Sequence, residues 1–173
     1  MQSETITEPL SLEDIKEWLI VSHSEDDALI MRLYKAVKLL CEARTKQFFT
    51  KHTVTVIACI YEPVFYLPRL PLLQFTSVTK RKYNLEEYEV LDADKYVLSA
   101  SMDTLYFYDY GTFKIIYEAG YDDENLIPDV IKQAMLSELA HLYENRGDKD
   151  MKPGLCATTV QMLTPYINTR YAI

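Results

Sequence analysis

The stretch over residues 120–146 most constrains the fold, because its local signals all indicate one long helix. Pro128 has a fixed φ and no N–H, which suits the first helical turn, and Asp129 places a negative charge where the helix dipole is positive. Gly147 is typical of the residue that follows a helix. Apolar side chains recur at helical spacing in between: Ile131, Met135, Leu136, Leu139, Ala140, Leu142 and Tyr143. This face is broad enough to predict a core helix.

A second, narrower stripe on the same helix carries small or polar side chains. Its members are Ala134, Ser137, His141 and Asn145. Small side chains allow another backbone to come close, so the helix can contact two neighbours. The stripe fits either a contact with another subunit or a contact within the chain's own core.

The N-terminal part predicts two more helices. Ser11 and Asp14 have the spacing of a capping box, and Ile15, Trp18 and Leu19 then form an apolar stripe. This stripe predicts that Trp18 is a core anchor.

The second helix is expected over residues 26–49. It has an inward stripe of Leu29, Leu33, Ala36, Val37, Leu40 and Ala43, with Arg32, Lys35, Lys38 and Arg44 outward.

The period changes after residue 50. Residues 52–61 are rich in β-branched side chains and predict a strand, whereas the prolines at 63, 68 and 71 restrict the next segment to a sheet edge. Residues 75–83 form another strand candidate. Residues 104–120 predict a hairpin around Tyr110 and Gly111, with Leu105 and Phe107 on one face. Tyr106 and Tyr108 would then lie on the other face.

The expected fold is therefore α+β: a bundle of about four helices with a small antiparallel sheet inserted between the second and third. We expect one domain, with N-terminal helices over residues 1–50, a β-region over 51–119, C-terminal helices over 120–165 and a tail over 166–173. In the last helix we expect Val160 and Leu163 to face the core, and Pro165 to end or kink the helix. The tail is unusually apolar and aromatic for a chain end, which suggests that it docks on a partner.

Composition excludes several classes of protein. A formal net charge of −8 argues against an electrostatic grip on nucleic acid, although an acidic surface suits a protein past which DNA must move without sticking. The first ten residues include Glu4 and Glu8 and contain no basic residue and no apolar run, so we expect neither a signal peptide nor a membrane anchor. The three cysteines, Cys41, Cys59 and Cys156, are far apart and lack metal-ligand spacing, so we expect buried, reduced thiols of a cytosolic protein.

A search for catalytic or metal-binding patterns finds none that is complete. The histidines His23, His52 and His141 are too far apart in sequence to indicate a metal pair. Glu138 and His141 have the Glu-x-x-His spacing of a di-iron helix, but that site needs a second such motif. The basic cluster Lys80, Arg81 and Lys82 is typical of a solvated strand edge. We therefore expect no catalytic residues, no metal and no cofactor, and a protein built for contact.

The chain resembles the head-tail connector, or head-completion adaptor, family of tailed bacteriophages. The resemblance is carried by PLSLEDIKEWL, DDALIMRLYKAVKLLCEAR, LPRLPLLQFTSV, YEAGYDDENLIPDVIKQAMLSELAHLYENRG and VQMLTPYINTRY, in the family's order. It departs from the family in its tyrosine-rich hairpin and its final TRYAI. The resemblance implies a structural virion protein at the head-tail interface, made in the host cytoplasm. It would form a ring, of twelve subunits in such adaptors, under the portal protein.

The resemblance also implies partners and contact residues. The ring would extend the DNA channel without specific DNA binding, have no membrane contact, and offer a platform for the next connector or tail-completion protein. The tail would dock on the portal through Tyr166, Ile167, Arg170, Tyr171 and Ile173. Candidates for subunit contacts are Arg32, Lys35, Ala134, Ser137, His141 and Asn145. Acids that face either the DNA channel or plain solvent are Glu86, Glu87, Glu89, Asp92 and Asp94.

Two other functions stay open on the residues alone. One is a soluble regulatory binding module that uses the tyrosines of the sheet as a groove. The other is a small hydrolase, which would need His141 and a carboxylate to converge in a pocket.

Overall fold

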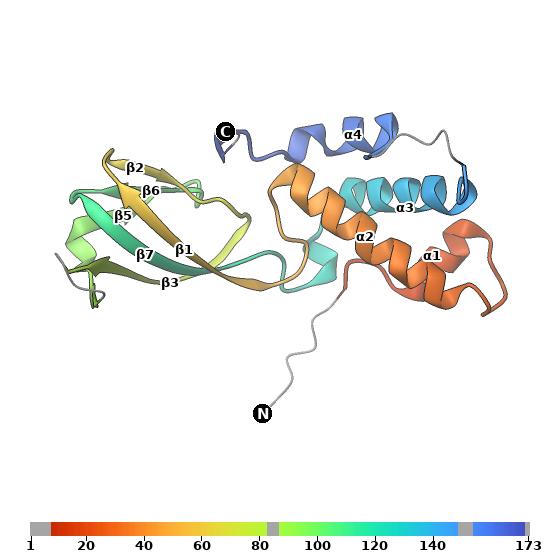
Figure 1. Ribbon diagram of the computed structural model, residues 1–173, viewed down its shortest axis with the longest axis horizontal. Helices are drawn as coiled ribbons and strands as arrows, with labels where there is room; N and C mark the ends of the chain where they lie inside the picture. The colour runs from red at the N-terminus through yellow and green to blue at the C-terminus, as the bar shows by residue number, and fades with distance from the viewer. Residues whose placement is uncertain (1–7, 83–86, 149–153, 172–173) are drawn as a thin grey trace, which may run out of the picture.

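The computed structural model describes residues 8–82, 87–148 and 154–171. Within these residues the chain has an elongated shape, with its helices at one end and its strands at the other (Figure 1). Each end has its own cluster of buried apolar side chains. The α+β class is confirmed, and the β-region is inserted between the second and third helices as expected.

The helical end contains four α-helices in the described part of the chain. Their bounds are α1 (Leu12–Leu19), α2 (Asp27–Thr45), α3 (Asp129–Glu144) and α4 (Ala157–Leu163). Ser11 and Asp14 form the expected capping box at the start of α1, and Pro128 is the N-cap residue of α3. Short 3-10 turns follow at η3 (Thr164–Tyr166), which contains Pro165, and at η4 (Thr169–Tyr171).

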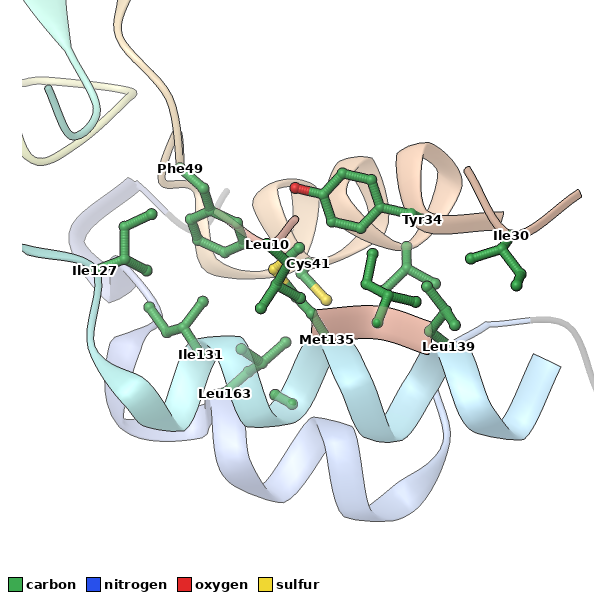
Figure 2. Close-up of a cluster of buried hydrophobic side chains, with 13 residues drawn as sticks. Leu10, Ile30, Tyr34, Cys41, Phe49, Ile127, Ile131, Met135, Leu139 and Leu163 are labelled. Atoms are coloured by element: carbon green, nitrogen blue, oxygen red, sulfur yellow. The ribbon is translucent and has the colours of Figure 1, made fainter. Parts of the chain in front are cut away.

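Helices α2 and α3 run antiparallel and form the centre of the bundle. At one end, Tyr143 near the end of α3 donates a hydrogen bond to Asp26 at the start of α2. At the other end, Ile131 near the start of α3 belongs to the same cluster as Phe49, just after α2 (Figure 2). Helix α4 packs mainly on α3, and Leu163 closes the cluster from that side. The bundle thus has one continuous core.

The four-stranded sheet has the order β1-β7-β3-β4, and its pairs are antiparallel. The strands are β1 (His52–Ile60), β7 (Gly111–Ala119), β3 (Leu72–Arg81) and β4 (Tyr88–Val90). Strand β7 pairs along its whole length with β1, from Gly111 opposite Ile60 to Ala119 opposite His52. Its alternate residues Phe113, Ile115 and Tyr117 are fully buried, which fixes the register.

A separate three-stranded sheet has the order β2-β6-β5. Its strands are β2 (Val64–Tyr66), β6 (Thr104–Phe107) and β5 (Tyr96–Leu98), with the turn η1 (Ala93–Lys95) before β5. The strand after Pro63 lies at an edge, as its prolines predict. Leu105 and Phe107 are buried while Tyr106 and Tyr108 are exposed, so the predicted division of faces is correct.

Three expectations about strand pairing, the end of the second helix and Trp18 are wrong. The β-region forms two sheets, so the predicted hairpin around Tyr110 and Gly111 does not exist: β6 pairs with β2 and β5, while β7 pairs with β1 and β3. Helix α2 ends at Thr45, where Lys46 has a positive φ of 59°, instead of continuing to Phe49. Trp18 is 45% exposed, because Ile15 takes the inward position of the short helix α1 and Trp18 lies at the margin of its inward side.

Short backbone contacts join the two ends of the molecule. Gly120 follows β7 and lies against the backbone of Thr50, and its N–H donates to Pro71. The carbonyl of Glu42, in α2, accepts a 3.0 Å hydrogen bond from the guanidinium of Arg69. These bonds fix where the sheets begin relative to the helices.

Candidate subunit and partner interfaces

In the bundle, helix α2 shows the largest difference between the burial expected from the sequence and the burial observed. The stripe predicted to point inward contains Val37, which is buried as expected, and five residues that the structure leaves partly or fully exposed: Leu29, Leu33, Ala36, Leu40 and Ala43. The buried side chains lie on the adjacent stripe, at Ile30, Tyr34, Val37 and Cys41. Helix α2 is thus apolar over two neighbouring stripes, and the described residues of the chain cover only one of them. The helical period alone could not show which stripe faces inward.

Positive charges flank the exposed stripe of α2. Arg32, Lys35 and Arg44 are all exposed, and none has an ion-pair partner within the described part of the chain. Lys38, which lies nearer the core side, pairs with Glu8 at 2.8 Å. An apolar stripe with unpaired cations is unusual on a chain with a net charge of −8.

The predicted small-residue stripe of α3 is covered by the same chain at one position and remains partly accessible at others. Ala134 is fully buried beneath α4, where its carbonyl accepts a 3.3 Å hydrogen bond from the Thr159 hydroxyl. The stripe therefore does let another backbone come close, but at Ala134 that backbone belongs to the same chain. Asn145 donates 2.8 Å from its side chain to the carbonyl of His141 at the end of the helix. Ser137 and His141 are half-buried.

The tail folds back on its own chain as far as Arg170. The carbonyl of Tyr166 accepts a 2.7 Å hydrogen bond from the side chain of Gln47, and the N–H of Asn168 donates to Thr45. Arg170 pairs with Asp103 at 2.6 Å. Desolvation opposes ionisation of Asp103, but hydrogen bonds from Ser101, Thr104 and Ser99, with a smaller contribution from the Arg170 charge, hold the pKa of its carboxyl below the usual range. Ile173 lies outside the described residues, as does the side chain of Tyr171.

The predicted channel-facing acids lie at the far end of the β-region. Glu87, Glu89, Asp92 and Asp94 are exposed, while Glu86 lies outside the described residues. Basic side chains surround them: Glu89 and Asp92 line an open hollow together with Lys80, Arg81, Lys82 and Lys95. The acids therefore belong to a surface of mixed charge.

Two buried carboxylates look at first like candidates for chemistry. Glu42 accepts a 2.8 Å hydrogen bond from the N–H of Phe49, and burial raises the pKa of its carboxyl. Glu138 accepts 2.8 Å from the N–H of Cys156, at the start of α4, and its other oxygen has no partner within the described residues. Glu138 satisfies a backbone donor at the start of α4, and Glu42 satisfies one in the segment between α2 and β1, so both have a structural role.

The remaining nucleophiles and histidines do not converge. Cys41 is buried as expected, whereas Cys59 is exposed and Cys156 is half-buried. Burial raises the pKa of the Cys41 thiol to about 12, so it stays protonated at neutral pH. His141 bonds Asn145, and His52 stacks on Phe48. Over the described ranges no group of three His, Cys, Asp or Glu residues is placed to hold a metal ion. None of the helices described is long and apolar enough to cross a membrane.

Known proteins resemble this chain in three-dimensional structure and not in sequence. No protein-family model and no curated protein matches the sequence. A chain in the structure "Neck of empty GTA particle computed with C6 symmetry" aligns with a TM-score of 0.69 and 16% identity, over 92% of this chain and 89% of that one. A chain in "Virion of native gene transfer agent (GTA) particle" aligns with a TM-score of 0.70 and 16% identity, over 92% of this chain and 89% of that one.

A third match extends the likeness to nearly the whole of both chains. A chain in "Neck of native GTA particle computed with C12 symmetry" aligns with a TM-score of 0.65 and 16% identity, over 94% of each. This chain shares its fold with proteins of phage-like particles. That likeness agrees with the connector resemblance indicated by the sequence.

Proposed function

We propose that this chain is a structural virion protein of the neck, where it acts as a head-tail connector without enzymatic activity. Copies of it form a ring under the portal protein, which extends the DNA channel and supports the next connector or tail-completion protein. The observation that carries the proposal is the fold shared with chains from neck structures of gene transfer agent particles over more than nine-tenths of this chain.

The shape of the molecule supports a connector with two working ends. Helices occupy one end and the sheets the other (Figure 1). A closed ring uses two different patches on each subunit, one for each neighbour, and so leaves the ends free for other partners. The exposed tyrosines of the β-region include Tyr61, Tyr66, Tyr106, Tyr108 and Tyr110. Tyrosine is enriched in interfaces, so this end offers a platform for the next protein.

Portal docking through the tail is part of the proposal. Because Tyr166 and Asn168 already bond the chain's own α2 region, the portal contact falls to Arg170 and the residues after it. Arg170 reaches the portal once its salt bridge with Asp103 is released, at a cost of about 1 kcal/mol or less, as for other exposed ion pairs.

The DNA path fits the charge of the molecule. A net charge of −8 disfavours binding to phosphates. The acids Glu87, Glu89, Asp92 and Asp94 border the channel at the sheet end, and the nearby lysines limit how repulsive that surface is.

A map of purified particles that contain this chain tests the function. The expected result is a ring of copies between portal and tail. Particles without this chain in the neck, while the chain is stably made in the host, would overturn the proposal. For the tail, Arg170→Glu should retain the fold and lose binding to purified portal rings, with Arg81→Glu at the opposite end as the matched control. Unchanged binding of Arg170→Glu would refute portal docking through this residue.

A second candidate is a soluble regulatory module that binds a partner protein through its tyrosine surface. The exposure of Tyr61, Tyr108 and Tyr110 favours it. The same particle preparation separates the two, since a regulatory module would be present in the host cell but absent from purified particles.

A further inference from the structure

The exposed stripe of α2 has a regular spacing that indicates a helical partner. Leu29, Leu33, Ala36, Leu40 and Ala43 are separated by four, three, four and three residues. This alternation keeps apolar side chains along one line, as in the seam between two helices that cross at a small angle. Leu40 is 41% exposed and the neighbouring Leu39 is 65% exposed. We call the five residues the α2 seam.

The outward side of α3 carries a second line with the same spacing. Val130, Gln133, Ser137, Ala140 and Glu144 are separated by three, four, three and four residues. Val130 is 44% exposed, Glu144 is exposed, and the other three are half-buried. We call these residues the α3 seam. Each seam spans fifteen residues, and the fourteen steps between its first and last residue correspond to about 21 Å of helix.

The two seams complement each other in size and charge. The α2 seam has three leucines, and the α3 seam has small or flexible side chains opposite them. Arg32 and Arg44 flank the first, whereas Asp129 and Glu144 lie at the two ends of the second. None of these four charged groups has an ion-pair partner within the ranges described. We propose that the α2 seam of one copy packs against the α3 seam of the next copy, and that this contact repeats around the ring.

Ring symmetry determines the direction of the contact. Within the chain, α2 and α3 are antiparallel. A twelvefold rotation turns the neighbour's α3 by no more than about 30°, so the helices of the contact are antiparallel too. The seams then match end to end, pairing position 29 with 144, 33 with 140, 36 with 137, 40 with 133 and 43 with 130. This register brings Arg44 close to Asp129 of the next copy and Arg32 close to its Glu144.

The inference rests on the proposed ring and goes further by naming its two faces. A charge exchange tests it with little risk to the fold. Arg32 is exposed, so Arg32→Glu disturbs no buried contact, and Glu144→Lys places a positive charge at the end of α3, where it complements the helix dipole. Purified particles would be assayed by quantitative mass spectrometry for copies of this chain per particle.

We expect Arg32→Glu to lower the number of copies per particle at least tenfold, because a like-charge contact repeats at every interface. Arg32→Glu combined with Glu144→Lys should recover it to within twofold of the wild type. Glu13→Lys on α1 is the matched control and should have no effect. Normal copy numbers for Arg32→Glu, or no recovery in the double variant, would overturn the seam while leaving the proposed function intact. Wild-type chain absent from particles would overturn the function itself.

Crosslinking gives an independent test of register. Ala36→Cys and Ser137→Cys are combined in one chain carrying Cys59→Ser and Cys156→Ser, where serine suits the N-cap position of α4. A short bis-maleimide should convert the ring in particles into a ladder of covalent oligomers. The control pair, Ala36→Cys with Glu13→Cys, should give no covalent oligomers. A dimer from Ala36→Cys alone would show that α2 packs on α2 of a second copy, and would overturn the proposal, as would the absence of a ladder.

Discussion

The carboxylate of Glu138, in the middle of α3, caps a different helix: its Oε2 accepts a 2.8 Å hydrogen bond from the N–H of Cys156, at the start of α4. Cys156 is the N-cap residue of α4 but makes no side-chain cap of its own. A buried residue of one helix thus supplies the cap that the next helix lacks. This explains why Glu138 is buried although nothing in the site suggests catalysis.

Replacing Glu138 should therefore destabilise the protein. Glu138→Ala leaves a buried N–H without an acceptor and opens a cavity, so we expect a loss of about 2–4 kcal/mol in the free energy of unfolding. Glu138→Gln retains an acceptor oxygen and should cost less than half as much. Urea unfolding measures both, with the exposed Glu144→Ala on the same helix as the control. Equal losses for the Ala and Gln variants would contradict the cap.

Glu42 should give a pH-dependent effect of known sign. Burial raises the pKa of its folded-state carboxyl, so its charge costs stability at neutral pH, and that cost disappears as pH falls through the raised pKa. Glu42→Gln retains an acceptor for the N–H of Phe49 and has no proton to bind. The difference in unfolding free energy, Glu42→Gln minus wild type, should therefore decrease between pH 7 and pH 4. A difference that increases as pH falls would show that the sign is wrong.

Gly120 should be far less tolerant of a side chain than Gly147. Both have positive φ, 117° and 94°, so alanine is strained at either position. Only at Gly120 would the added Cβ overlap the backbone of Thr50, and at Gly147 it would meet nothing within 4 Å. We expect Gly147→Ala to cost about 1 kcal/mol and Gly120→Ala at least about 3 kcal/mol, measured by thermal unfolding. Similar costs would mean that the backbone at Thr50 yields.

Shortening one side chain on each apolar stripe of α2 should distinguish a residue that stabilises the fold from a residue that assembly requires. Val37 is fully buried, so Val37→Ala should lower stability by about 1–3 kcal/mol. Leu40→Ala should cost less than about 1 kcal/mol in the isolated chain, because its side chain is 41% exposed. In particles, only a contact with a neighbour would make Leu40→Ala the more damaging variant. Chemical unfolding and copy number per particle, measured on the same two variants, check this reversal.

Releasing Arg170 from Asp103 should loosen the tail without unfolding the chain. Asp103 also accepts hydrogen bonds from Ser101 and Thr104, so Arg170→Ala is the cleaner change. We expect faster hydrogen exchange at residues 169–171 and a change in global stability below about 1 kcal/mol. Exchange at Asn168 should stay slow, because its N–H donates 2.9 Å to Thr45. Faster exchange throughout α4 would contradict a local role.

The sequence predicted the helices and strands better than it predicted the buried face of a helix or the pairing of the strands. The capping box at Ser11, the helix after Pro128 and the edge strand after Pro63 follow from local chemistry, and all were found. The inward face of α2 could not be predicted, because the helix has two adjacent apolar stripes and local periodicity does not show which one its neighbours cover.

Strand pairing and the tail depended on distant contacts. Strand β6 could have turned back onto β7, but it pairs instead with β2, about forty residues earlier in the chain. The tail was predicted to be apolar and available, yet Gln47 and Thr45 hold it through backbone groups that no sequence pattern indicates. The proposed interface residues Arg32, Lys35 and Ser137 are accessible to a neighbour, whereas Ala134 is not.

The narrow junction near Gly120 has a mechanical consequence. Backbone hydrogen bonds from Gly120 to Pro71 and from Phe48 to Leu70 tie the sheets to the helices at the same level of the molecule. Because Pro71 and Leu70 are neighbours in the chain, we expect bending of one end against the other to stretch both bonds at once. We therefore expect a force on the sheets to reach the helical end with little hinge motion at the junction.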